Sequence, residues 1–503
     1  MRWVVVLCVL AGCKRVQSSP GEPDAPTSLT VTIDRRSAVR DPASLLITVD
    51  GALSSSVDSI RVAGASFPVT YTLDVSERTG PFQISVDAVA SSGELVGRGT
   101  ATTSLDAWTA RVMLHGADFV VNTTYAGNQF VSDDAESGGM QVAGSVNGDW
   151  LVAFRDSCES CVIHARRFDV VGQPIIWQSS GIGDQLAIST MPTTPSAVPA
   201  VATVGSRTVV VWDYTDPVSA ERGIACRAFD VSGPLPGQPR IALEPADAVS
   251  ATALVSGNFL LTWRNRDAND TVTIRAAIVD WTCAVIVSPY KVSTIPSTSW
   301  SRRSHAASNG DRVMYSWVVD GDVYLRDGID SGTLVGTQGT AIRNTPTSRL
   351  EHVRVSRWVT GFAVVARRAA WNVQVEGQLE LYRISADGLI DLKPIIVDDR
   401  TGSDSRSNQA FGIAARDDGT LMVVWHVCSS APDSCDVYAR IVRSDGTFAG
   451  DKFLVPTNTV GDQMLPSVTV VENVFAITWT DASGAYPDAS GTSVRARIID
   501  PDL

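Results

Sequence analysis

The sequence predicts an all-β protein, and three observations lead to this prediction. The chain of 503 residues contains 39 Gly and 24 Pro, and it has no long tract of strong helix formers. From residue 28 onward, short runs with an apolar residue at every second position alternate with clusters of turn residues. After about residue 117, one pattern of strands recurs seven times along the chain.

The composition indicates a folded, acidic protein. Hydrophobic residues make up 44% of the chain and charged residues 19%, which is ordinary for a globular protein with a buried core. The 41 Lys and Arg are outnumbered by 54 Asp and Glu, so the net charge is −13. Because nucleic acids and anionic membrane surfaces attract basic faces, we expect neither nucleic acid nor a polybasic membrane contact among the partners.

The chain opens with a segment that has the form of an export signal. Arg2 precedes an apolar run over residues 3–12, which is too short for a membrane span because a spanning helix needs about 20 residues. The run ends in Leu10-Ala11-Gly12-Cys13, which resembles the lipobox of bacterial lipoproteins at all four positions. The resemblance implies a signal peptide over residues 1–12, cleavage before Cys13 and lipid on its sulfur. A plain secretory signal with a chance cysteine is the alternative.

Residues 13–27 are predicted to be a lipid-anchored tether. They are polar and rich in Pro and Ser, so they cannot bury enough apolar surface to fold. Lys14 follows the lipobox cysteine, where an Asp would imply retention at the inner membrane. The resemblance therefore favours the outer membrane, on its periplasmic face or at the cell surface, and makes the membrane an expected partner through the lipid.

Residues 28–116 are predicted to form a small β-sandwich that is immunoglobulin-like in architecture. Seven short runs have period-two apolar spacing, and Gly, Pro, Asp or Ser separate them. The Cys…Trp…Cys pattern of true immunoglobulin domains is absent, which leaves the strand topology open. The seven runs lie at 29–34, 45–50, 59–63, 70–75, 82–90, 95–103 and 110–115.

Residues 117–503 repeat one unit seven times. Each unit contains an apolar strand such as Val209-Val-Val-Trp212, and the ends of successive copies lie about 54 positions apart. The next strand has the form apolar-x-small-Arg-x-apolar, as in Val437-Tyr-Ala-Arg440-Ile-Val442, and is followed by turn residues and another strand. Four strands in meander order, without helical periodicity, predict either a β-propeller or a solenoid.

The two ends of the array favour the closed ring. The final copy stops after its third strand, and a segment that parallels the missing fourth strand lies upstream at Asp118-Phe-Val-Val-Asn122. Pairing of this first strand with the last sheet closes a ring, whereas a solenoid needs polar caps instead. We therefore predict a seven-bladed β-propeller over 117–503, closed by residues 118–122. Blades are expected at 138–178, 179–244, 245–294, 295–338, 339–398, 399–456 and 457–503.

The array is similar to the propeller-type repeats of bacterial surface lipoproteins, over about three quarters of the chain. The resemblance implies a fold and no particular activity. The repeated Trp is expected to fill the space between neighbouring blades. The repeated Arg is expected to pair with a carboxylate or a carbonyl at the same relative place in each blade.

Cysteine usage predicts disulfides, because an exported chain meets an oxidising environment. Cys428 and Cys435 flank a hairpin loop and are expected to bridge its base. Cys226 and Cys283 either pair with each other or remain thiols.

Cys158 and Cys161 are expected to close a small loop in the same way. A zinc site formed by these two residues and His164 is an alternative, but a second ligand pair at metal spacing is missing. No metal site is therefore predicted here.

No motif of a known catalytic site occurs in the chain: there is no Gly-x-Ser-x-Gly elbow, His-Glu-x-x-His, Walker loop or EF-hand loop. No catalytic residue and no cofactor is therefore predicted. Asp-rich turns at 320–322 and 398–404 are candidates for Ca²⁺, although solvated turn carboxylates are the favoured interpretation.

One face of the propeller is predicted to bind a ligand. The long loops between second and third strands are expected to gather with the inter-blade loops around one channel mouth. They carry arginine and aromatic residues that suit an acidic glycan or a protein partner, although a mixed solvated surface is the favoured interpretation of these residues. The candidate binding residues are Arg155, Tyr214, Arg264, Arg302, Arg303, His305, Arg367, Arg368, Trp371, His426 and Tyr486.

The favoured functional hypothesis is a lipid-anchored envelope protein whose propeller is a binding or scaffold module for a glycan or protein. The alternative is a polysaccharide hydrolase or lyase with carboxylates at the channel mouth. A purely structural component of an envelope assembly is the third hypothesis. Paired carboxylates at a pocket would favour the hydrolase or lyase.

Overall fold

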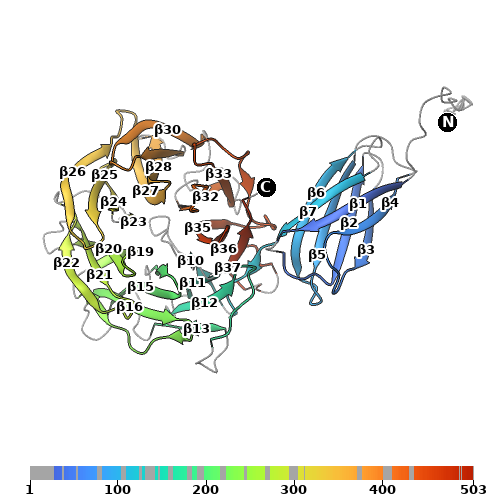
Figure 1. Cartoon of the computed structure of the whole chain (residues 1–503), viewed down its shortest axis with the longest axis horizontal. Helices are drawn as coiled ribbons and strands as arrows, with labels where there is room; N and C mark the ends of the chain where they lie inside the picture. The colour runs from blue at the N-terminus through green and yellow to red at the C-terminus, as the bar shows by residue number, and fades with distance from the viewer. Residues whose placement is uncertain are drawn as a thin grey trace, which may run out of the picture.

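The computed structural model consists of a ring of small sheets with a separate β domain on one side (Figure 1). It describes residues 28–36, 39–51, 55–75, 82–103, 109–123, 127–130, 142–144, 148–156, 162–177, 184–189, 198–215, 222–242, 246–266, 272–293, 304–310, 312–370, 377–399, 410–429, 435–485, 488 and 490–501. The expected signal peptide, Cys13 and the tether lie outside these residues. Within the described ranges, no helix is long and apolar enough to cross a membrane.

The N-terminal domain is built from strands that alternate between buried and exposed residues. Val31 and Ile33 on one strand, and Ile84 and Val86 on another, point into one shared core with Ile47. The strands are β1 (Ser28–Arg35), β2 (Ser44–Gly51), β3 (Ser55–Arg61), β4 (Val69–Asp74), β5 (Phe82–Val89), β6 (Leu95–Thr103) and β7 (Thr109–Gly116).

The pairing of these strands does not confirm the expected immunoglobulin-like sandwich. The seven strands form one curled sheet in the order β3-β2-β5-β6-β7-β1-β4. The strand β7 pairs in parallel with β1 and meets β6 through two residue pairs at its end, Gly97 with Gly116 and Arg98 with His115. Alternation in the sequence predicts that a strand exists but not which neighbours it joins.

The remaining strands form the predicted seven blades (Figure 1). The first three blades contain β9 (Gln129–Phe130), β10 (Val142–Gly144), β11 (Asp149–Asp156), β12 (Ile163–Asp169) and β13 (Gln185–Ala187); β14 (Ala200–Val204), β15 (Arg207–Thr215), β16 (Arg222–Asp230), β17 (Gly233–Pro234) and β18 (Arg240–Ala242); and β19 (Ala246–Ala253), β20 (Phe259–Arg266), β21 (Val272–Val279) and β22 (Val285–Lys291).

Blades 4 to 7 follow the same meander order from the centre outward. They contain β23 (His305–Asn309), β24 (Arg312–Val319), β25 (Asp322–Ile329) and β26 (Leu334–Ile342); β27 (Ser348–Trp358), β28 (Gly361–Ala370), β29 (Gly377–Ile384) and β30 (Ile390–Asp398); β31 (Phe411–Ala415), β32 (Leu421–Cys428), β33 (Cys435–Val442) and β34 (Phe453–Leu454); and β35 (Gln463–Val471), β36 (Val474–Asp481), β37 (Ser493–Ile499) and β8 (Phe119–Val120).

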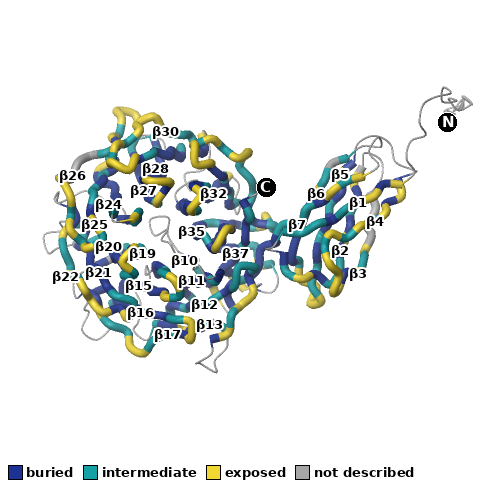
Figure 2. Tube along the Cα trace, in the orientation of Figure 1, coloured by how far each residue is buried: buried dark blue, intermediate teal, exposed yellow. Residues whose placement is uncertain are grey.

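Two outer strands lie beyond the blade limits expected from the sequence. The strand β13 starts after residue 178, and β26 ends after residue 338. Outer strands are the least regular part of the unit, because β13 has three residues and β26 pairs with β25 through register shifts. Such strands carry too little apolar alternation to be delimited from the sequence. Figure 2 shows buried residues inside the blades and exposed residues along the outer rim.

The ring is closed by the predicted latch segment, residues 118–122. Phe119 and Val120 pair with Ala496 and Arg495 on β37, and the Val121 amide donates to the Val494 carbonyl at 2.7 Å. The prediction of a closed propeller is therefore confirmed. The chain then continues to β9, which pairs with β11 of the first blade and so joins both sides of the seam.

A separate apolar cluster fills each of the seven interfaces between neighbouring blades. The repeated Trp of the second strand is fully buried in five of these interfaces, which confirms its expected packing role. These residues are Trp212, Trp263, Trp317, Trp425 and Trp479.

The repeated Arg of the third strand also joins blades. In four blades its Nη1 donates to a backbone carbonyl at the outer strand of the preceding blade, as predicted for a carbonyl partner. Arg227 instead donates to Gly237 within its own blade. The four inter-blade pairs are Arg166 with Val121, Arg326 with Val292, Arg440 with Val397, and Arg497 with Val455.

Two of the expected disulfides are present. Cys428 and Cys435 bridge the base of their hairpin, as predicted. Cys226 and Cys283 bond to each other and so join blades 2 and 3, which decides between the two alternatives left by the sequence. Cys158 and Cys161 lie outside the described residues.

Candidate functional site

The described candidate binding residues lie at the end of the blades where the second strands end and the inner strands begin. Five of them are buried: Arg155, Tyr214, His305, Arg367 and His426. Arg264 and Arg368 are half-buried. Arg302, Arg303, Trp371 and Tyr486 lie outside the described residues.

In blade 5, the two adjacent arginines point to opposite faces of the sheet and form separate ion pairs. Arg367 pairs with the buried Glu351. Arg368 Nε lies 2.8 Å and 2.9 Å from the two carboxylate oxygens of Glu380, and its Nη2 donates to the Tyr382 hydroxyl at 3.2 Å. Burial, followed by the hydrogen bond to Glu380, raises the pKa of Tyr382. Both arginines are thus engaged inside the propeller.

Arg155 and Tyr214 are held by contacts between charged and aromatic groups. The Arg155 guanidinium lies 5.7 Å from the ring centroid of Phe130, which belongs to β9. The Arg240 guanidinium lies 5.2 Å from the ring of Tyr214. These contacts engage both side chains within the propeller.

A carboxylate pair that the sequence did not single out lies at the same end, between blades 6 and 7. Asp462 Oδ1 accepts a hydrogen bond from the Cys435 amide at 2.9 Å. Asp436, the next residue, is half-buried, and its Oδ1 has no hydrogen-bond partner among the described residues. Burial and the charge of Asp462 raise the pKa of Asp436. No motif links these two residues, which belong to adjacent blades.

A central hollow of about 990 Å³ lies inside the ring and is lined by the innermost strand of every blade. Its wall consists largely of small, apolar and hydroxyl side chains, such as Ala202, Ala251, Ala307 and Thr469. Small residues recur here because seven inner strands converge on one axis.

Charged residues gather at one mouth of this central hollow, at the turns between first and second strands. The turns of blades 5, 6 and 7 carry Arg357, Arg416, Asp417, Asp418 and Glu472. Arg357 pairs with Asp417 across two blades, and Arg416 Nη2 lies 3.0 Å from Asp418 Oδ2. Among the described lining residues, the charged groups at this mouth all come from the turns of blades 5 to 7, which together form an ionic arc.

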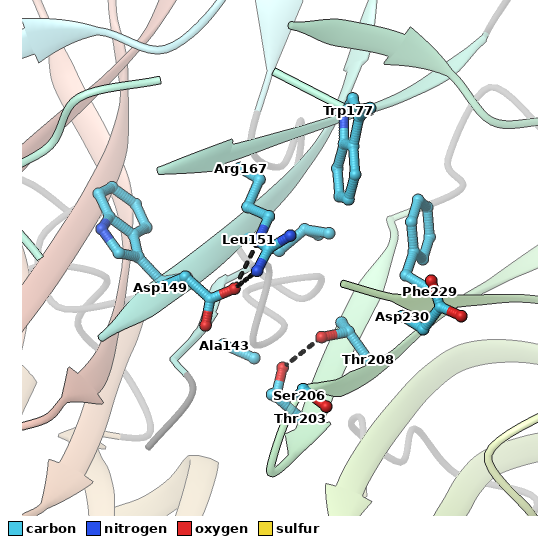
Figure 3. A pocket seen from close by; sticks show the side chains of 11 residues that line it. Ala143, Asp149, Leu151, Arg167, Trp177, Thr203, Ser206, Thr208, Phe229 and Asp230 are labelled. Atoms are coloured by element: carbon cyan, nitrogen blue, oxygen red, sulfur yellow. Dashed lines mark hydrogen bonds and ion pairs between the residues drawn. The ribbon is translucent and has the colours of Figure 1, made fainter. Parts of the chain in front are cut away.

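A second hollow, between blades 1 and 2, is too small for a ligand (Figure 3). Arg167 pairs with Asp149 and lies 5.6 Å from the ring of Trp177, which in turn lies 5.5 Å from the ring of Phe229. The hollow has a volume of about 10 Å³, which is close to the space that one water needs. This arrangement joins two blades and offers no binding site.

The Asp-rich turns proposed for Ca²⁺ carry structural contacts where they are described. Asp322 accepts a hydrogen bond from the Asn344 amide at 2.7 Å, and Asp398 pairs with Lys452 at 2.5 Å. His164, the third member of the zinc alternative, lies 3.2 Å from Asp156. Among the described residues, no group of three or more His, Cys, Asp or Glu is placed to hold a metal.

Comparison with known proteins gives similarity in fold alone. No protein-family model matches the chain, and no curated protein matches it. A Dyadobacter fermentans protein of unknown function is 10% identical, over 76% of this chain and 98% of that chain, with a TM-score of 0.41.

Two further solved structures are similar at the same level. A Hadza microbial sialidase is 9% identical over 94% of this chain and 93% of its own, with a TM-score of 0.47. The polysaccharide lyase Uly1 is 7% identical over 76% of this chain and 94% of its own, with a TM-score of 0.43. At these values the similarity carries no argument about activity.

Proposed function

We propose that the protein is anchored in the bacterial envelope by lipid on Cys13 and that its propeller binds a glycan or a protein partner. The N-terminal β domain acts as a spacer between the lipid and the ring. The lipobox Leu10-Ala11-Gly12-Cys13 and the polar tether support the anchor.

The observation that carries the binding role is the central hollow. Its volume of about 990 Å³ is at the upper end of the range of ligand sites. Its wall offers small and hydroxyl side chains, while the ionic arc at one mouth offers charges of both signs. A wall of this kind suits recognition of a neutral or weakly charged ligand, with Arg357 and Arg416 supplying orientation.

A glycan array probed with the purified protein tests the binding role. A double variant, Arg357→Ala with Arg416→Ala, is expected to bind about tenfold more weakly, because hydrogen bonds to charged groups at the mouth are lost. Arg264→Ala, at the opposite end of the blades, serves as the matched control. A loss of affinity in Arg264→Ala alone would place the binding site at the end of the blades where the second strands end. Unchanged affinity in both variants would contradict a binding site on the propeller.

The anchor is tested separately by fractionation. Cys13→Ala is expected to move the protein from the membrane fraction to the soluble fraction, and mass spectrometry of the membrane-bound form should detect lipid on Cys13. Retention of the variant in the membrane fraction would contradict the lipid anchor.

A second candidate function, a polysaccharide hydrolase or lyase, is favoured by one specific observation, the raised pKa of Asp436 beside Asp462. Glycoside hydrolysis needs one protonated acid next to an ionised carboxylate. This second function is tested by measuring the release of reducing ends or unsaturated products from acidic polysaccharides. Asp436→Asn is expected to abolish turnover, whereas Asp417→Asn, at the far mouth, should retain it; turnover that persists without Asp436 excludes this pair as the site.

A further inference from the structure

The two domains meet at a junction cleft of about 530 Å³, which is separate from the central hollow. Arg35, Arg36 and Arg40 line it on the N-terminal domain, and Val171 and Gln173 line it on the first blade. Clefts between domains are frequent ligand sites because both walls are already in place.

Two contacts beside the junction cleft hold the N-terminal domain against the propeller. Arg36 Nη1 lies 3.7 Å from Asp500 Oδ2, and Arg497 Nε donates to the Gly116 carbonyl at 2.8 Å. These contacts join the N-terminal domain to the last blade, so the junction cleft is a defined space and not a gap between independent bodies.

The lining of the junction cleft carries three arginines, and each has a carboxylate partner: Asp41 for Arg35, Asp500 for Arg36 and Glu94 for Arg40. Asp41 is the one carboxylate among the described lining residues, against three arginines. Arg35 Nη1 pairs with Asp41 at 2.6 Å, but the Asp41 side chain is 93% exposed. An ion pair in such an exposed position is weak, so an incoming anion can replace Asp41 at Arg35.

Arg40, in the lining of the junction cleft, is held in place by two contacts. Its Nη2 and Nη1 lie 2.5 Å and 3.3 Å from the two carboxylate oxygens of Glu94, and its guanidinium lies 5.6 Å from the ring of Phe119. This double contact holds Arg40 in place and offsets its charge, so direct contact with a ligand falls to Arg35, whose ion pair with Asp41 is exposed, and to Arg36, which lies 3.7 Å from Asp500.

The rest of the lining suits a sugar ring. Val39, Ala90 and Val96 provide an apolar surface next to the arginines, and the exposed side chain of Gln173 offers an amide donor and acceptor on the facing wall. An apolar surface with a few converging polar groups is the usual form of a small-molecule site.

We propose that the junction cleft binds an acidic saccharide. The carboxylate of a uronic acid accepts hydrogen bonds from Arg35 and Arg36, the sugar ring packs against Val39 and Val96, and Gln173 hydrogen-bonds a hydroxyl. This site is independent of the central hollow, so the proposal goes beyond the binding role of the propeller.

Isothermal titration of the purified protein with an oligogalacturonate trisaccharide tests the proposal. Arg35→Gln is expected to weaken binding by about tenfold, because a charge-assisted hydrogen bond is lost while the Arg36–Asp500 contact at the junction is kept. Asp41→Asn is expected to strengthen binding, since it removes the internal anion that competes for Arg35. This gain cannot result from damage to the fold.

Arg111→Gln is the matched control, because Arg111 pairs with Asp34 at 2.8 Å in the same domain but does not line the junction cleft. It should leave the affinity unchanged. Two further probes separate the ligand chemistry: the same trisaccharide with its carboxyl groups reduced, and inorganic phosphate. Equal binding of the reduced sugar, equal binding of phosphate, or no gain with Asp41→Asn would each overturn the proposal.

Discussion

At the scale of single residues, arginine is the side chain that this propeller uses to connect its blades. The guanidinium reaches a backbone carbonyl of the preceding blade in four of the seven repeats. Such a carbonyl lies at the end of an outer strand and has no neighbouring strand beyond it, so the arginine supplies the donor that the sheet lacks.

Arg440 provides a direct test of this role. Arg440→Ala should lower the free energy of unfolding by about 1–3 kcal/mol, because the bond to the Val397 carbonyl at 3.0 Å and the contact with Phe448 are both lost. Urea unfolding followed by tryptophan fluorescence measures the change. Arg227 lies at the same position of blade 2 but bonds within its own blade, so Arg227→Ala should lower the free energy of unfolding by less. Equal decreases in the two variants would argue against an inter-blade role.

His115 makes the stability of the domain junction depend on pH. Burial, with the charges of Arg497 and Arg36, lowers the pKa of His115 below its ordinary value of 6.5. A histidine with a lowered pKa contributes stability that is fully present above pH 6.5 and is lost as the pH falls below that value. His115→Gln should flatten the decline in the free energy of unfolding as the pH falls below 6.5. If the free energy of unfolding declined identically in the variant, the pH dependence would belong to titratable groups other than His115.

At the scale of the strands and blades, the repeat is regular inside and irregular outside. Second and third strands have seven to ten residues and are mostly buried, whereas several outer strands have two or three residues. Short outer strands leave little exposed edge for pairing with other chains, which is the usual protection of a propeller. The disulfide between Cys226 and Cys283 adds a covalent link between two blades.

Removal of this inter-blade disulfide should destabilise the ring. Cys226→Ser is expected to lower the free energy of unfolding by roughly 2–5 kcal/mol, because the unfolded chain regains the conformational freedom of a loop that spans 57 residues. Urea unfolding under non-reducing conditions measures the change. Cys435→Ser opens a loop of only seven residues and should cost less. A larger loss in that control would contradict the loop-length argument.

At the scale of the whole molecule, stability depends on one non-covalent seam. Phe119 packs against Trp150 and Phe168 of the first blade, with ring centroids 6.2 Å and 5.4 Å apart. Next to it, Arg495 Nη1 lies 3.2 Å from Asp118 and its Nε lies 2.9 Å from Asp481, all buried. The same latch segment leads into the N-terminal domain, so ring closure and domain placement share one structural element.

The seam gives a prediction for the whole molecule. Phe119→Ala should lower the free energy of unfolding by about 3–5 kcal/mol and increase hydrogen exchange along β37, because the latch loses its buried anchor. Phe453→Ala is the comparison, since Phe453 holds the equivalent place in the outer strand of blade 6 and packs between blades 6 and 7 without taking part in the latch. Similar exchange along β37 in both variants would show that the latch does not limit opening.

The sequence alone was sufficient for the parts of this protein that are encoded by periodicity. Strand alternation, the repeated Trp and Arg, and the displaced strand at 118–122 predict a closed ring of seven blades, because each repeat must satisfy the same packing requirement. The pairing of Cys428 with Cys435 follows in the same way from their position at the base of one hairpin.

Only the tertiary structure decided which distant residues meet. It placed Arg367 against Glu351 and Asp436 beside Asp462, joined β7 to both β6 and β1, and brought Arg35 opposite Gln173 in the junction cleft. A local pattern determines whether a side chain points inward or outward, but ion pairs, pKa shifts and clefts depend on separations in space that periodicity does not encode.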